Sequence, residues 1–131
     1  MKGSTNANVQ LSPNDIPITV TSPIGEAIYH SQCIKVGRTV FVGVIFNLSV
    51  ARTNTSILKM VSTSSLTPII MSNIPVFNYT QNGENSTNIH RFVNVYHNSS
   101  DNANTVYINV GSDMTIPVGN WQLTFTYLTD A

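Results

Sequence analysis

The chain has few charged residues and a single cysteine. Charged side chains make up 9% of its 131 residues, with six basic and six acidic groups, against roughly 25% in an ordinary globular protein. A neutral chain without a basic cluster cannot steer a polyanion, so we expect neither nucleic-acid binding nor attraction to an acidic membrane. Because Cys33 is the only cysteine, an intrachain disulfide is excluded.

Long hydrophobic runs are also missing. The longest uninterrupted apolar run covers residues 40–46 and includes Gly43, whereas a membrane-spanning helix needs about 20 apolar residues. No apolar stretch follows Lys2, so a secretory signal is not predicted. We interpret residues 1–14 as a polar leader or linker and residues 15–131 as one domain, because a chain of this length can bury a core without disulfides.

A two-residue period is the strongest pattern that the sequence does contain. In a strand, successive side chains point to opposite faces of the sheet. Residues 119–129 read as one strand, because within residues 121–127 apolar side chains occupy one parity and Gln or Thr the other. The residues predicted to face inward are Trp121, Leu123, Phe125 and Tyr127.

The same period recurs along most of the chain. Residues 39–50 form the longest predicted strand, and its first half is apolar on both faces, which is typical of a central strand. Residues 105–110 also alternate, and residues 16–20 read as an edge strand because Pro17 cannot donate to a ladder. Residues 27–36 place His30 on the inner parity, together with Ile28, Ile34 and Val36.

One apolar segment does not alternate. Ile57, Leu58, Met60 and Val61 break the two-residue period, so residues 57–61 fit either a β-bulge or a helical turn. Eight to ten short strands separated by turn residues nevertheless predict an all-β fold, an antiparallel β-sandwich or barrel.

Residues that carry chemistry form no catalytic constellation. No nucleophile elbow, Walker loop, dinucleotide-binding turn or zinc-protease motif occurs. His90 and His97 lie seven residues apart on one predicted strand, so they point to opposite faces and cannot share a metal. The loop 98–104 has one carboxylate, which favours a solvated loop over a calcium site. We therefore predict no enzymatic activity, no cofactor and no metal.

The order of the predicted elements carries a resemblance. Residues 34–45 lead into the long strand, and a proline-bearing stretch follows at 68–77. Paired strands come next, the last of them covering residues 106–110, and residues 116–129 complete the pattern. This arrangement resembles the C-terminal head domains of tail-fibre and baseplate receptor-binding proteins of long-tailed phages that infect Gram-positive bacteria. The resemblance covers residues 24–129. It departs from the family pattern in having only a short polar leader before the head.

The resemblance implies a jelly-roll-like, trimeric head on the phage tail or baseplate of the virion. Such a homotrimer contacts other tail or baseplate proteins and binds host cell-wall polysaccharide or teichoic acid, without membrane insertion. Ligand groups in these heads tend to lie on loops and strand ends. The candidate ligand-binding residues are therefore His97, Asp101, Asn102, Asp113 and Trp121.

Two points remain open. Trp121 lies on the inner parity of its strand, which favours a core role over a sugar-stacking platform, and Cys33 reads as a small buried residue. Two alternatives to a receptor-binding head also remain: a structural trimerisation domain of a virion fibre, and a sugar-binding module of a secreted hydrolase.

Overall fold

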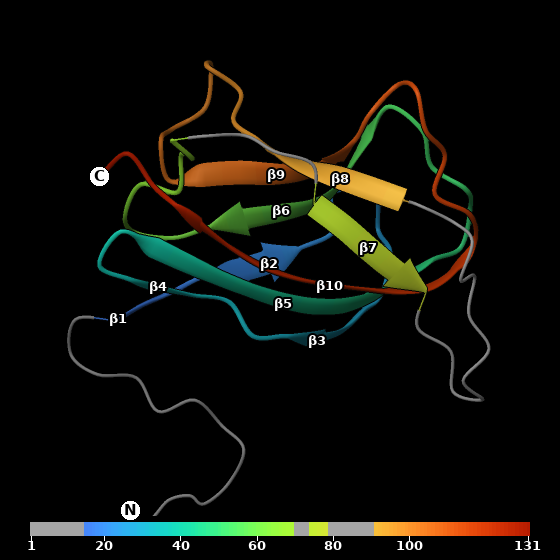
Figure 1. The fold of residues 1–131 in the computed structure, drawn as a ribbon, viewed down its shortest axis with the longest axis horizontal. Helices are drawn as coiled ribbons and strands as arrows, with labels where there is room; N and C mark the ends of the chain where they lie inside the picture. Colours follow the sequence, from blue (N-terminus) through green and yellow to red (C-terminus); the bar gives the residue numbers. More distant parts are fainter. Residues whose placement is uncertain (1–14, 70–73, 79–90) are drawn as a thin grey trace, which may run out of the picture.

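The computed structural model describes residues 15–69, 74–78 and 91–131, and this part of the chain folds into antiparallel strands without a helix (Figure 1). The prediction of an all-β antiparallel fold is confirmed. The strands are β1 (Asp15–Pro17), β2 (Thr19–Thr21), β3 (Ile28–Ser31), β4 (Ile34–Val36), β5 (Thr39–Leu48), β6 (Thr55–Val61), β7 (Ile74–Asn78), β8 (Arg91–Tyr96), β9 (Thr105–Val110) and β10 (Gly119–Leu128).

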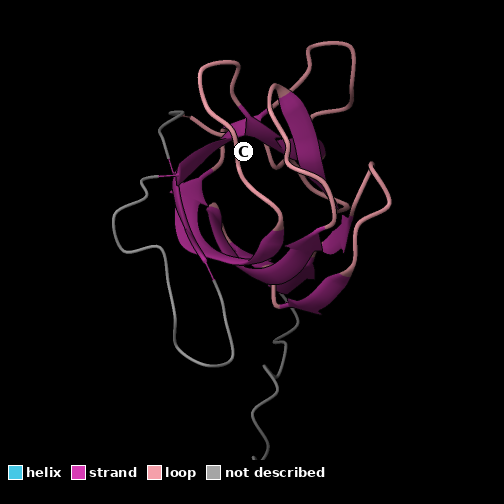
Figure 2. Ribbon diagram, turned by 90° about the vertical axis from the view of Figure 1, so that its right-hand side faces the viewer, coloured by secondary structure: helices cyan, strands magenta, loops and turns pink. Residues whose placement is uncertain are grey.

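The strands form two antiparallel layers around one core. The hydrogen-bonded order is β1-β4-β5-β10-β7-β8-β9-β6-β2, and β3 adds to β5. One layer is built on β5 and β10 and the other on β6, β8 and β9, while β7 pairs with both β10 and β8. On the opposite side the chain passes from β1, paired with β4, to β2, paired with β6. The strands therefore wrap around the core, as Figure 2 shows end-on.

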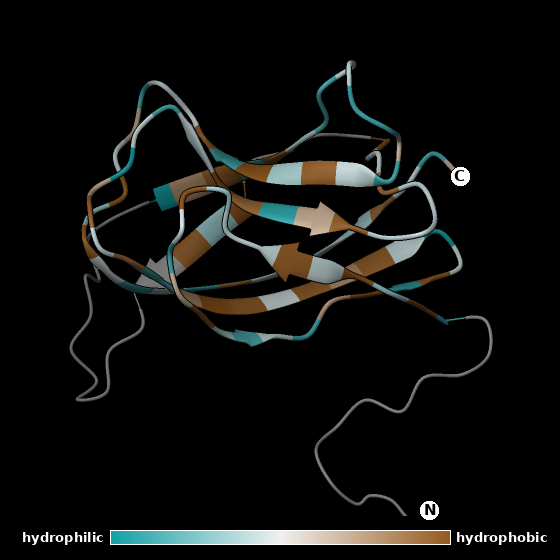
Figure 3. Ribbon diagram, turned by 180° about the vertical axis from the view of Figure 1, so that it is seen from behind, coloured by the Kyte–Doolittle hydropathy of each residue, from teal (hydrophilic) through white to brown (hydrophobic). Residues whose placement is uncertain are grey.

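The core lies between the inward faces of the two layers. Strands β5 and β10 pair in continuous register from Gly119 opposite Leu48 to Leu128 opposite Thr39. The alternating bands of Figure 3 follow the predicted two-residue period. The four residues of β10 predicted to face inward lie on the core side: Trp121 and Leu123 are buried, and Phe125 and Tyr127 are half-buried against the core. Also buried are Val40, Val42, Val44, Phe46 and Leu48 of β5 and Val106, Ile108 and Val110 of β9.

The break in alternation at β6 is a bulge. The register with β9 shifts between Ser56 and Leu58, so Ile57 and Leu58 are both buried although they are neighbours in sequence. An extra residue on one strand turns the following side chains to the other face. Of the two alternatives for this segment the bulge is confirmed, and the helical turn is wrong.

The prediction of which side chains face inward in residues 27–36 is wrong. Two separate strands, β3 and β4, replace one strand, and His30 and Val36 are exposed. Ile28 pairs with Phe46 but His30 with Ile45, so one extra residue, Tyr29, reverses the parity.

In β4 the pairing register places Lys35 opposite Val40, on the core side. Lys35 is 1% exposed, and its ammonium group donates hydrogen bonds to Ser64 Oγ, Ser65 O and Ala131 O in place of water.

Other boundaries differ in smaller ways. Strand β5 ends at Leu48, and Val50 is exposed beyond it. The predicted edge strand 16–20 is divided into β1 and β2, and β1 does lie at an end of the strand order. Predictions for residues 1–14 and for His90 fall outside the described residues.

Candidate functional site

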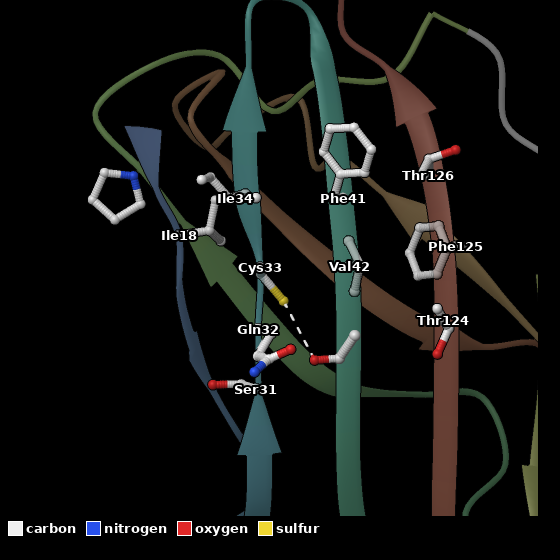
Figure 4. A pocket seen from close by; sticks show the side chains of 12 residues that line it. Ile18, Ser31, Gln32, Cys33, Ile34, Phe41, Val42, Thr124, Phe125 and Thr126 are labelled. Carbon is white, nitrogen blue, oxygen red and sulfur yellow. Dashed lines mark hydrogen bonds between the residues drawn. The ribbon is translucent and has the colours of Figure 1, made fainter. Parts of the chain in front are cut away.

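A groove lies over β5 and β10, where the outward-facing Phe41, Gly43, Thr124 and Thr126 adjoin the core residues Ile18 and Val42 (Figure 4). It has two adjoining parts of about 720 Å³ and about 310 Å³, which share Gln32, Gly43 and Thr124. Volumes of this size are typical of small-ligand sites. The larger part is lined by Pro17, Ile18, Ser31, Gln32, Cys33, Ile34, Phe41, Val42, Gly43, Thr124, Phe125 and Thr126, and the smaller part adds His30, Val44, Ile45 and Gln122.

Gly43 lies where the two parts of the groove meet. On β5 it shares the outward parity with Phe41 and Ile45, so a missing side chain leaves a hollow between two larger ones. Its backbone is held on both sides. Gly43 pairs with Thr124 of β10, and it exchanges two hydrogen bonds with Gln32, in which Gln32 N donates to Gly43 O at 2.7 Å and Gly43 N donates to Gln32 O at 3.1 Å.

The groove presents polar side chains, and no Lys, Arg, Asp or Glu is among its described lining residues. The side chains of His30, Gln32, Thr124 and Thr126 are exposed, and together they offer amide, hydroxyl and imidazole groups that both donate and accept. Phe41 is 43% exposed beside them, so its ring is accessible to a ligand.

Cys33 is the one thiol in the groove, and it is half-buried. Its Sγ lies 4.0 Å from the backbone oxygen of Gly43. Burial raises the pKa of the Cys33 thiol, an effect larger than the opposing contact with Gly43. The groove is therefore neutral at this position at pH 7, and the thiol is a weak nucleophile.

The candidate residues chosen from the sequence lie elsewhere. His97, Asp101 and Asn102 belong to the β8–β9 connection, whereas Asp113 is exposed in the turn after β9, at the opposite end of that strand. None of the five candidates is among the described groove-lining residues. Trp121 is 2% exposed, in the core.

Each half-buried or buried candidate has a structural partner. The Trp121 indole Nε1 donates to Pro117 O at 2.9 Å, and His97 Nδ1 lies 3.1 Å from Thr105 O. In the loop, Asp101 N donates to Asn98 O at 2.8 Å, which closes a turn. These contacts account for the local conformation of the candidates without a ligand.

Sequence reasoning missed the groove, although one signal pointed to it. A glycine inside an apolar strand weakens that strand and often marks the close approach of a ligand or of another backbone. Gly43 lies in the middle of the longest apolar run. The groove residues come from β1, β3, β4, β5 and β10 and from the β1–β2 and β3–β4 connections, and only tertiary pairing brings these together.

No protein-family model, curated protein or solved structure matches the chain. Within residues 15–69, 74–78 and 91–131, no three His, Cys, Asp or Glu side chains gather as a metal ion would require. The same part of the chain has no helix of the length and apolarity needed to cross a membrane.

Proposed function

We propose that this protein is the non-catalytic receptor-binding head of a phage tail fibre or baseplate, and that it binds a saccharide of the host cell wall. The observation that carries the proposal is the groove on β5 and β10, in which uncharged hydrogen-bonding side chains surround the exposed ring of Phe41.

Saccharide chemistry matches these groups. Sugar hydroxyls donate and accept hydrogen bonds, as do the amide of Gln32 and the hydroxyls of Thr124 and Thr126. The apolar face of a sugar ring packs on an aromatic ring, and Phe41 supplies one at the groove wall. Most glycosidases cleave with a pair of carboxylates. The described lining instead offers neutral side chains, which supports binding without cleavage.

A homotrimer at the tip of a fibre fits weak individual sites. A groove of neutral groups gains no long-range charge attraction, so each site alone binds weakly. Linked sites turn the second and third contacts into intramolecular events, which raises avidity by orders of magnitude. We therefore propose that several heads engage the same cell-wall polymer at once, on a virion that also holds them against other tail or baseplate proteins.

A structural trimerisation domain is the second candidate, and one surface feature favours it. Val36 and Leu128 flank Thr39 on neighbouring strands, on the same outward face as Phe41. Val36 is 43% exposed and Leu128 is 55% exposed. Apolar side chains gathered on one face are typical of a surface that another protein covers.

Two measurements on the purified chain distinguish these functions. Binding to an array of immobilised bacterial cell-wall polysaccharides tests recognition, and light scattering gives the oligomeric state. A trimer that binds a polysaccharide supports the receptor-binding head, and a trimer without binding contradicts it in favour of the structural domain. A monomer that binds a polysaccharide fits the sugar-binding module of a hydrolase, and release of sugar fragments would overturn the non-catalytic assignment.

A further inference from the structure

We propose that Gly43 keeps the groove open for a sugar ring, and that the groove takes neutral glycans rather than phosphate-bearing polymers such as teichoic acids. This inference rests on the proposed saccharide-binding function and adds to it the class of ligand and the residue that admits it. Three structural observations support it.

The first observation is that backbone conformation does not require glycine at position 43. Among the described glycines, only Gly25, Gly37 and Gly119 adopt a positive φ, the region that disfavours side chains. A Cβ atom built on Gly43 meets nothing closer than the backbone oxygen of Gln32, at 3.6 Å, which is an ordinary van der Waals distance. Alanine would therefore fit this position in the folded chain.

The second observation is that Gly43 does not mark a bulge. The β5–β10 register passes without interruption from Val42 through Gly43 to Val44. The irregularity on the other side of β5 lies in β3, between Ile28 and His30. A glycine inside a strand costs stability, because it has no side chain to pack and it loses more conformational freedom on folding. The unbroken register excludes a bulge, and the 3.6 Å between the added Cβ and Gln32 O means that the neighbouring backbone does not require glycine either. Close approach of a ligand to the strand then explains the residue.

The third observation concerns charge. No Lys, Arg, Asp or Glu is among the described residues that line either part of the groove. Proteins recognise phosphate mainly through Arg and Lys, which supply charge-assisted hydrogen bonds. Lys35 is adjacent to the groove residue Ile34 in sequence, but it points into the core, where its Nζ donates to Ser64 Oγ, Ser65 O and Ala131 O. It therefore cannot serve an anionic ligand in the groove.

Filling the hollow tests the role of Gly43. Gly43→Val adds a branched side chain that suits a strand and occupies the middle of the groove. Thr21→Val is the matched control, because it places the same side chain at an exposed position of β2 outside the groove. We expect Gly43→Val to keep or raise the melting temperature and to weaken polysaccharide binding at least tenfold, while Thr21→Val leaves the affinity unchanged.

The ligands for this test are immobilised neutral hexose polysaccharides and poly(glycerol phosphate), with affinity measured by surface plasmon resonance. We expect the wild-type chain to bind a neutral polymer and not poly(glycerol phosphate), with little change between 50 and 500 mM salt. If Gly43→Val lowers the melting temperature, Gly43→Ala replaces it, with an expected loss of at least threefold.

The outcomes separate this inference from the proposed function. Polysaccharide binding that survives both Gly43 substitutions would show that the ligand lies elsewhere, while saccharide recognition itself would stand. Preferential, salt-sensitive binding to poly(glycerol phosphate) would overturn the neutral-ligand assignment alone. A wild-type chain that binds no polymer would contradict the proposed function as well.

Discussion

The ammonium group of Lys35 donates a hydrogen bond of 2.6 Å to the backbone oxygen of Ser65. This contact joins β4 to the segment that follows β6, in the opposite layer. The same Nζ donates to Ser64 Oγ at 2.8 Å and to the backbone oxygen of Ala131 at 2.7 Å. Each of its three protons therefore has an acceptor, which is the condition under which a buried charge is tolerated.

We expect Lys35→Met to destabilise the fold, because it removes the ammonium group that donates to three acceptors. The loss should be at least about 2 kcal/mol, since a buried polar group left without a partner costs about 1–3 kcal/mol. Lys59→Met, at a half-buried position of β6, is the control and should change the unfolding free energy by less than about 0.5 kcal/mol. Urea denaturation measures the stability of both variants. Equal unfolding midpoints for Lys35→Met and Lys59→Met would contradict the assigned role of Lys35.

The pH dependence of stability should report on Glu26. Burial raises the pKa of this carboxyl, but hydrogen bonds from Ser49 N and Oγ and the Arg52 guanidinium at 3.1 Å outweigh burial and hold the pKa below its ordinary value of 4.5. The folded state then binds a proton at Glu26 less readily than the unfolded state. The stability that ionised Glu26 contributes is therefore fully present above pH 4.5. It is lost as the pH falls through the lower folded pKa.

Thermal unfolding between pH 3 and pH 7 checks this expectation. Glu26→Gln should lower the stability at pH 7 by about 1 kcal/mol, in line with a hydrogen-bonded charge. It should also flatten the acidic limb of the curve relative to the wild-type chain. An unchanged acidic limb would mean that other carboxyl groups dominate acid unfolding.

Trp121→Ala should impair folding rather than recognition. The indole is buried between the layers, so its removal leaves a cavity that costs about 3–5 kcal/mol. Trp121→Phe keeps most of the apolar volume but loses the hydrogen bond to Pro117, at a cost of about 1 kcal/mol in addition to any repacking. Denaturant unfolding and polysaccharide binding should be measured together. A fully stable Trp121→Ala variant that has lost binding would reverse the assignment.

Phe41→Ala should have the opposite profile. The ring is 43% exposed, so its loss should change the unfolding free energy by less than about 1 kcal/mol. Affinity for the saccharide should fall about two- to tenfold, which corresponds to the energy of one aromatic contact. Leu128→Ala is a control on the same face, because Leu128 lies outside the described groove lining. Equal losses in the two variants would indicate that this face contributes only general hydrophobicity.

Cys33 offers a chemical probe of the groove. Because burial raises the pKa of the thiol, alkylation by iodoacetamide should be slow at pH 7 and should accelerate as the pH rises. A saccharide that occupies the groove should slow the reaction further, in proportion to the occupied fraction. Mass spectrometry follows the modification. A rate that does not change at saturating saccharide would place the ligand away from Cys33.

The sequence predicts the elements whose environment is uniform along their length. Burial alternates along β5, β9 and β10. The two-residue period identifies the buried face of β9 and β10, whereas the first half of β5 is apolar on both faces and its buried face follows from pairing. The same reasoning fails in residues 27–36, because the extra residue Tyr29 changes the pairing register. Residues 57–61 break the alternation and so indicate a bulge or a helical turn, whereas residues 27–36 alternate in sequence and give no sign of a bulge.

For the candidate site, too, local sequence predicted one part and strand pairing decided the rest. Local sequence identified His97, Asp101 and Asn102 as polar residues of a loop, but it could not say which polar groups lie beside a hollow. Gln32, Gly43 and Thr124 meet because Gly43 of β5 pairs with Thr124 of β10 and exchanges backbone hydrogen bonds with Gln32 of the β3–β4 connection.

The sequence by itself determined an all-β chain with a neutral polar surface and an apolar inner face, because side-chain alternation and composition are local properties. Only the tertiary structure decided which face holds Lys35 and where the groove lies. Both depend on cross-strand register, and a shift of one residue exchanges the buried face of a strand for the exposed one.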